Sequence, residues 1–205
     1  MEKKKINNNG YEYVDLNLPS GTLWSTCNVG ADKPIDYGLY FQWGDTQGYT
    51  KEQVGKDKPF NFANYKLSIN GSFTNFSKYT TPGTMLELED DAANVNMGGN
   101  WHIPTPEQIR ELIDNTIATW KTLDDGISGK LFTSKKDKSK SIFIPAAGYV
   151  WKDFSGECGK DGFLWSSMLD PNYVYSSKNL GFNSKGSYLC AYNRDFGFSI
   201  RGVIG

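Results

Sequence analysis

The sequence predicts an α+β domain in which small twisted antiparallel sheets and long irregular loops surround a small helical component. Aromatic residues make up 15% of the 205 residues and glycine occurs 22 times, a composition typical of many short strands and turns. Strong helical periodicity occurs mainly in one segment, residues 105–117. We therefore expect a polar arm over residues 1–10 and a single domain over residues 11–205.

The main helix is expected to begin after Thr105. Thr105 can cap it, Pro106 suits the first turn because its missing N–H would have no partner there, and Gln108 completes a capping box. The apolar residues that recur at helical spacing and predict one buried face are Ile109, Leu112, Ile113 and Ile117.

A second, short helix is expected over residues 86–93 and carries an acidic run. Calcium loops place oxygen ligands on alternate residues around a glycine turn, and this run does neither. We therefore expect a solvated helix face, one carboxylate bonded to backbone or arginine, and no metal. The carboxylates are Glu87, Glu89, Asp90 and Asp91, and the residues expected on the apolar side are Leu88, Ala92 and Val95.

Short strands are expected on both sides of the helical part. A long polar excursion, residues 45–83, lies between the first strands and the helices, and we expect its aromatic residues to anchor it to the core. The segments with strand-like alternation or apolar runs are residues 11–16, 23–24, 131–132, 141–145, 162–167, 179–182 and 196–203. The residues of the later strands that we assign to the core are Trp165, Leu180, Phe182, Phe198, Ile200 and Val203.

Charge and hydropathy exclude several classes of partner. The net charge is −1 and the isoelectric point is about 5.9, so no overall field attracts nucleic acid or an anionic membrane. No apolar run is long enough to span a bilayer, and the charged start lacks the apolar region of an export signal. We expect no nucleic-acid partner, no membrane insertion and no signal peptide.

The single histidine and the three cysteines do not form a metal site by their spacing. His102 precedes Pro104 in an extended segment, where a hydrogen bond to a neighbouring loop is the expected role. Cys27, Cys158 and Cys190 form neither an even disulfide set nor a C-x-x-C pair. The sequence thus predicts no structural zinc.

Several segments, taken together and in order, resemble one known family, the Fibrobacter succinogenes major paralogous domain, which is widespread in Bacteroidetes and their phages. The resemblance implies a C-type-lectin-like fold of the variety shared with formylglycine-generating enzymes, with neighbouring termini and a ligand surface in the irregular C-terminal half. The segments that carry it are residues 13–31, 37–46, 86–93, 98–113, 141–149, 164–167, 180–183 and 194–203.

The resemblance also raises the question of whether the chain has the active-site residues of the related enzymes. The enzymes of this fold hold copper with two cysteines near the C-terminus, but beside Cys190 the run 191–194 supplies no second thiol. The sequence also lacks the Glu-Pro-Asn and Trp-Asn-Asp runs of calcium-dependent lectins. We expect no catalytic residue, metal or cofactor; the alternative is a remnant of such an oxidase that relies on Cys190.

The C-terminal segment, residues 164–203, also resembles the variable region of proteins diversified by retroelements. Copying errors at template adenines change asparagine codons into a restricted set, and residues 187–193, 195 and 196 contain only permitted types. This resemblance implies a surface under selection for ligand binding.

The residues of this segment have the chemistry of a recognition surface. Tyrosines set among small polar residues provide rigid amphipathic area with adaptable hydrogen bonds, as in antibody loops. We expect a non-enzymatic module whose C-terminal loops bind a protein or glycan on a cell surface, as part of a phage or a bacterial surface; the second alternative is a purely structural virion or cell-surface domain. The expected ligand-binding residues are Asp170, Asn172, Tyr173, Tyr175, Asn183, Ser187, Tyr188, Tyr192, Asn193, Asp195 and Phe196.

Overall fold

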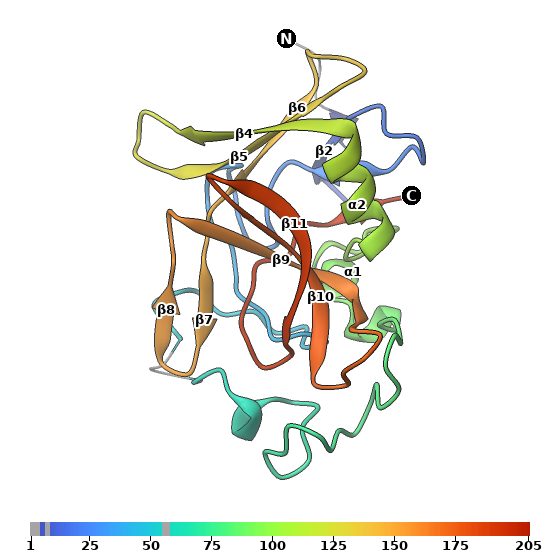
Figure 1. Cartoon of the computed structure of the whole chain (residues 1–205), viewed down its shortest axis with the longest axis vertical. Helices are drawn as coiled ribbons and strands as arrows, with labels where there is room; N and C mark the ends of the chain where they lie inside the picture. Colours follow the sequence, from blue (N-terminus) through green and yellow to red (C-terminus); the bar gives the residue numbers. More distant parts are fainter. Residues whose placement is uncertain (1–4, 7–8, 55–57) are drawn as a thin grey trace.

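A computed structural model of the protein describes residues 5–6, 9–54 and 58–205 (Figure 1). Four small sheets, whose named strands all pair antiparallel, make up most of the fold, and the helices are few and short. Strands from both ends of the chain share the first sheet, in the order β1-β2-β3-β12. Its strands are β1 (Lys5–Ile6), β2 (Glu12–Asp15), β3 (Leu23–Ser25) and β12 (Val203–Ile204).

The other three sheets are formed by neighbours in sequence. They have the orders β11-β10-β9, β4-β5-β6 and β7-β8, and this arrangement confirms the predicted small antiparallel sheets. Four of these strands were not expected from the sequence; they are β4, β7, β8 and β11. The bounds are β4 (Thr116–Thr122), β5 (Ser128–Ser134), β6 (Ser141–Pro145), β7 (Tyr149–Trp151), β8 (Phe154–Gly156), β9 (Asp161–Leu169), β10 (Ser176–Asn183) and β11 (Gly186–Asn193).

The main helix, α2 (Pro106–Asn115), begins as predicted. Thr105 accepts a hydrogen bond from the backbone of Gln108, and the Gln108 side chain accepts one from the backbone of Thr105. The prediction that Ile117 belongs to the buried helical face is wrong, because β4 starts at Thr116 and Ile117 is 47% exposed. The β-branched and alternating residues that follow Asn115 favour a strand over a further helical turn.

The short helix differs from its prediction. It is divided into a 3-10 turn, η2 (Leu88–Asp90), and a helix, α1 (Ala92–Met97), because the Asp91 side chain accepts a hydrogen bond from the Asn94 backbone and starts a new helix there. Leu88 and Val95 are 64% and 53% exposed, so only Ala92 of the expected apolar side is buried. No helix of the described residues is both long and apolar enough to cross a membrane.

The polar excursion is anchored by its aromatic residues, as predicted. Its described residues contain one 3-10 turn, η1 (Phe62–Asn64), and it extends below the sheets in Figure 1. Residues 55–57 of this stretch lie outside the described residues. The anchors, each no more than 7% exposed, are Phe60, Tyr65, Phe76 and Tyr79.

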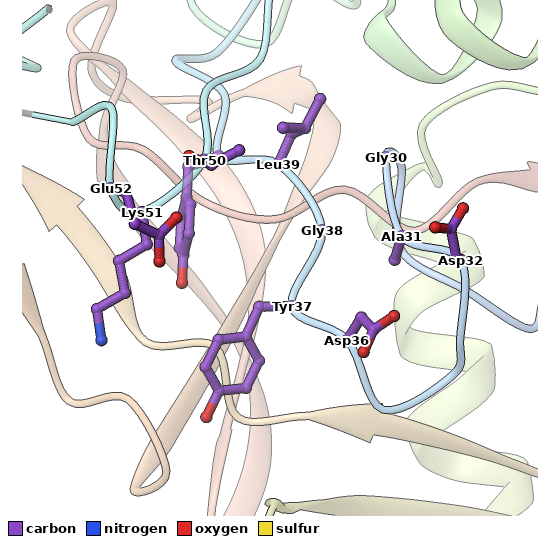
Figure 2. A pocket seen from close by; sticks show the side chains of 11 residues that line it. Gly30, Ala31, Asp32, Asp36, Tyr37, Gly38, Leu39, Thr50, Lys51 and Glu52 are labelled. Carbon is purple, nitrogen blue, oxygen red and sulfur yellow. The ribbon is translucent and has the colours of Figure 1, made fainter.

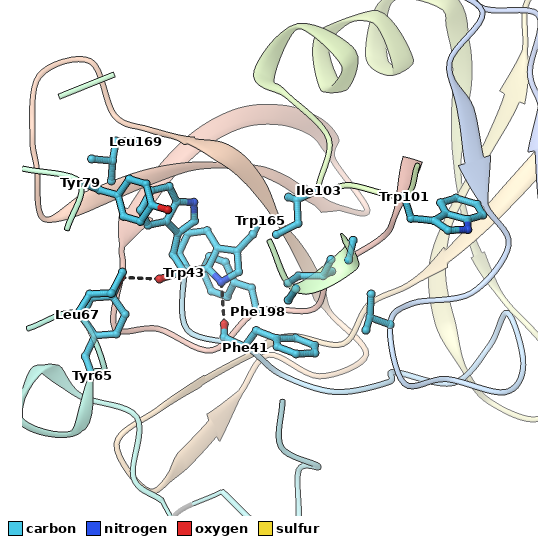
Figure 3. Packing of buried hydrophobic residues seen from close by; sticks show 14 of the residues in the cluster. Phe41, Trp43, Tyr65, Leu67, Tyr79, Trp101, Ile103, Trp165, Leu169 and Phe198 are labelled. Atoms are coloured by element: carbon cyan, nitrogen blue, oxygen red, sulfur yellow. Dashed lines mark hydrogen bonds between the residues drawn. The ribbon is translucent and has the colours of Figure 1, made fainter. Parts of the chain in front are cut away.

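The residues of the later strands that the sequence assigns to the core are all buried. Trp165 and Phe198 pack closely, with ring centroids 4.3 Å apart and ring planes tilted by 32°, and the Trp165 indole donates a hydrogen bond to the Phe41 carbonyl (Figure 3). Residues 196–203, expected as one strand, form mainly isolated bridges and reach regular pairing only in β12. The further assigned residues, each at most 1% exposed, are Leu180, Phe182, Ile200 and Val203. Trp24, Trp43 and Trp101 are buried to the same extent.

Arg194 is a fully buried residue that the sequence analysis did not single out. Its guanidinium donates hydrogen bonds to the Tyr65 hydroxyl and to the carbonyls of Lys78, Tyr79 and Val174, at 3.0–3.3 Å. It also lies 4.0 Å from the Phe76 ring centroid. Among the described residues no carboxylate forms an ion pair with it. One side chain thus fastens the polar excursion to the C-terminal segment.

Replacing Arg194 by methionine is expected to lower the free energy of unfolding by about 3 to 5 kcal/mol, because several buried acceptors lose their donor at once. Urea denaturation monitored by tryptophan fluorescence measures this loss. The matched control is Arg110→Met on the exposed side of α2, which should change stability by less than about 0.5 kcal/mol. Equal effects of the two variants would contradict this role of Arg194.

Candidate functional site

Four of the eleven expected residues lie on β11, so the expected loop surface is partly a strand; they are Ser187, Tyr188, Tyr192 and Asn193. Successive side chains of a strand point to opposite faces. Tyr188 and Tyr192 lie on one face of the sheet, whereas Ser187 and Asn193 point to the other, on which Leu189 packs into the core. The expected ligand-binding set therefore does not form one continuous surface.

Two expected site residues are buried, which corrects their assignment to the exposed surface. Asp170 is 5% exposed; its carboxylate lies 2.7 Å from the Lys178 ammonium and accepts a hydrogen bond from the Asn172 backbone. This carboxylate stabilises the connection between β9 and β10. Asp195 is 2% exposed and lies below the surface beside Trp151.

Tyr173 and Tyr175 form a small aromatic group at the β9–β10 connection. Their ring centroids are 5.3 Å apart, and the Tyr175 ring contacts Phe73 of the polar excursion at 6.1 Å. Tyr173 and Phe73 are 54% and 59% exposed, and Asn172 beside them is also exposed. Phe73 could not be predicted from the sequence, because only the fold brings the polar excursion next to the β9–β10 connection.

A larger group surrounds Tyr192, and we call it the aromatic face. The Tyr192 ring lies 5.3 Å from Phe163 and 5.7 Å from Phe196, and Phe196 stacks on Trp151 at 5.5 Å. Phe154 is 58% and Tyr192 is 38% exposed, and the other rings are half-buried. The aromatic face consists of Tyr149, Trp151, Phe154, Phe163, Tyr192 and Phe196.

The fold builds the aromatic face from three segments. The backbone of Val150 in β7 pairs with that of Gly197, which places the β7–β8 hairpin beside the C-terminal segment. The Phe60 ring packs directly against Gly197. A Cβ atom at position 197 would lie 2.3 Å from that ring, so glycine is needed for this close approach. Phe198 supports the face from below, stacked on Phe163 at 4.9 Å. Sequence analysis identified only Tyr192 and Phe196, because pairing distant in sequence supplies the rest.

Buried acceptors lie beside the aromatic face. The Trp151 indole donates a hydrogen bond to one oxygen of Asp195 at 3.2 Å, and no other described residue donates one to the second oxygen, Oδ1. Gln42 donates to the Asp195 carbonyl at 2.9 Å, while its own Oε1 is buried without a partner. Burial raises the pKa of Asp195 to about 6, although the Trp151 hydrogen bond opposes the shift. Because both oxygens are buried, a ligand on the surface of the aromatic face does not reach them.

Tyr188 lies toward the other end of β11, about 13 Å from Tyr192 along the strand. Its hydroxyl donates to the Asn183 side chain at 2.8 Å, and Asn183 in turn donates to Asp161 at 2.9 Å. A pocket of about 380 Å³ lies beside Asn183 and includes one indole ring, that of Trp120. Its principal lining residues are Trp120, Lys160, Asp161, Asn183 and Lys185.

A further pocket of about 450 Å³ contains no expected site residue (Figure 2). Asp32 and Asp36 line one side of it, and Lys51 and Glu52 come from the polar excursion. Tyr37 projects between them, and burial raises its pKa. This pocket lacks the exposed aromatic rings of the C-terminal surface.

The acidic run is not a freely solvated helix face. Glu87, Glu89 and Asp90 converge on the Lys78 ammonium at 2.6, 2.6 and 2.7 Å, so a lysine occupies the point where the three carboxylates meet. Asp91 instead accepts hydrogen bonds from the backbone of Asn94 and Ile103. The expected bond from one carboxylate to backbone is thus present.

His102 serves the scaffold, as expected, and Arg201 does so too. The His102 ring nitrogens lie 3.0 and 3.1 Å from the carbonyl oxygens of Ile103 and Gly205. Arg201 is fully buried and bonds to Asn28 and to two backbone carbonyls.

All three cysteines are unpaired thiols. The Cys190 sulfur lies 2.9 Å from the Asn179 side-chain oxygen, and burial raises the pKa of Cys190 to about 11. Without a metal ion beside it, the Cys190 thiol is therefore protonated at neutral pH.

Comparisons with protein-family models, curated proteins and solved structures give no match to this chain.

The raised pKa of Asp195 predicts a pH dependence of stability. The folded chain binds this proton more tightly than the unfolded chain, whose pKa is near 3.8, so the contribution of Asp195 to stability is lost as pH rises from about 4 to about 6. Asp195→Asn should remove this part of the pH profile and raise stability at pH 7 by about 1 to 2 kcal/mol, allowing for partial solvation.

The measurement is urea denaturation at several pH values, with the exposed Asp153→Asn as the matched control. An Asp195→Asn profile that falls over the same pH range as the unchanged protein would show that another group causes the dependence.

Proposed function

We propose that the chain is a non-enzymatic recognition module with a C-type-lectin-like fold, which binds a protein or glycan on a cell surface through its C-terminal surface. The observation that carries the proposal is the aromatic face, where six aromatic rings gather and those of Phe154 and Tyr192 are exposed. Exposed apolar groups gathered on one face are typical of binding sites.

The chemistry of the aromatic face suits ligands with both apolar and hydroxyl-bearing surfaces. The rings offer flat apolar area, and Tyr149 and Tyr192 each add a hydroxyl group that can donate and accept hydrogen bonds. The face uses Tyr192 and Phe196 of the expected set, while Tyr173, Tyr175 and Asn172 form a separate candidate contact.

The oxidase alternative is less well supported by the site. It relies on Cys190, whose sulfur faces the Asn179 amide oxygen and whose pKa is raised, and no second cysteine of the described chain pairs with it. The purely structural alternative leaves the exposed rings without a role. Placement on a phage or a bacterial surface rests on the family resemblance.

The test compares Phe154→Ala and Tyr192→Ala with Phe73→Ala, which removes an equally exposed ring from the other aromatic group. Labelled protein is applied to an oligosaccharide array and to intact bacterial cells, and thermal unfolding is measured in parallel. The first two variants should lose at least about tenfold in affinity because they remove contact area. The melting temperature of Phe154→Ala, which removes the more exposed ring, should be nearly unchanged.

Loss of binding in Phe73→Ala alone would move the site to the β9–β10 connection. Unchanged binding in all three variants would contradict a ligand site on either aromatic group.

A further inference from the structure

β11 is an open sheet edge. In the order β11-β10-β9 it pairs with β10 on one side, and no other described segment forms a bridge to residues 186–193. Its side chains are exposed or half-buried along its whole length. An open edge offers main-chain donors and acceptors to another strand.

The hydrogen bonds fix which backbone groups point outward. The backbone N–H of Arg194 donates to the Tyr175 carbonyl at 2.9 Å and continues the β10–β11 register, so these two residues form a hydrogen-bonded pair. Hydrogen-bonded and non-hydrogen-bonded pairs alternate along an antiparallel ladder. Tyr188, Cys190 and Tyr192 therefore direct their main-chain groups toward β10, and the residues between them direct theirs outward. The outward residues, whose main-chain groups have no partner among the described residues, are Ser187, Leu189 and Ala191.

The sequence of β11 does not protect this edge. Edge strands that stay unpaired usually carry lysine, proline or a bulge, whereas Gly186–Asn193 contains no charged residue and no proline. The one irregularity in the sheet lies between β10 and β9, away from β11. The edge is thus both chemically neutral and regular.

We propose that β11 pairs antiparallel with β11 of a second copy of this chain, with Cys190 on the two-fold axis. In this register Tyr188 lies opposite Tyr192 of the partner subunit, and Leu189 lies opposite Ala191 of the partner subunit. Each residue meets one of similar polarity, as a self-complementary two-fold interface requires. The outward groups of Leu189 and Ala191 then form main-chain hydrogen bonds across the interface.

This register also predicts the geometry at Cys190. Because Cys190 directs its own main-chain groups toward β10, the two copies of Cys190 form a non-hydrogen-bonded pair with Cα atoms about 4.5 Å apart. That distance lies within the range of a disulfide. Both copies of the aromatic face lie on the same side of the joined sheet, so the dimer would present two adjacent ligand sites.

The first test compares Ala191→Pro with Ala191→Ser by sedimentation velocity over a wide range of concentrations. Proline removes an outward donor and is tolerated on edge strands, whereas serine retains the donor. The unchanged protein and Ala191→Ser should approach twice the monomer mass of 23.0 kDa at high concentration, and Ala191→Pro should stay at the monomer mass. Dimers that persist in Ala191→Pro, or their absence in the unchanged protein, would overturn the proposal.

A second test leaves the strand unchanged. A variant that retains only Cys190 is treated with a mild oxidant that takes up the two electrons and two protons released when two thiols form a disulfide. It should give a covalent dimer on non-reducing gels many times faster than variants that retain only Cys27 or only Cys158. Equal rates would contradict Cys190 at the axis. Phe154→Ala should still dimerise, so failure of ligand binding and failure of dimerisation can be told apart.

Discussion

Burial of the Arg194 guanidinium is the constraint on which the C-terminal half depends. Its hydrogen bonds join Tyr65, Lys78 and Tyr79 of the polar excursion to Val174 in the β9–β10 connection. A charged group can be buried only if its donors are satisfied, so these segments must meet around it. The residue that follows it is Asp195, and the fixed position of Arg194 determines how the chain leaves β11 and passes under the aromatic face.

Local signals predicted the elements that depend on neighbouring residues. The capping box at Thr105 places the start of α2 because the bonds join residues three apart. The end of that helix could not be predicted, since Ile117 fits helical spacing as well as a strand. β11 was expected to be a loop, because its serine, tyrosine and asparagine residues suit a loop as well as a strand. Only the pairing with β10, which the local sequence does not reveal, makes it a strand.

The candidate site could be predicted only in part for the same reason. Tyrosines near the C-terminus indicated a binding surface, and Tyr192 and Phe196 do lie on the aromatic face. β11 was not expected to be a strand, and because successive side chains of a strand point to opposite faces, Ser187 and Asn193 lie on the face opposite Tyr192. Trp151 and Phe154 carry no local signal of function, because the bridge between Val150 and Gly197 brings them there.

The central claim is that the aromatic face binds the ligand while Arg194 maintains the fold. A deep mutational scan of residues 145–203, sorted separately for display of folded protein and for binding to the cells or oligosaccharide that the unchanged protein binds, tests it most directly. Substitutions of Trp151, Phe154 and Tyr192 should abolish binding with normal display, and those of Arg194 should abolish display. Binding-specific positions confined to the opposite face of β11 would contradict the account.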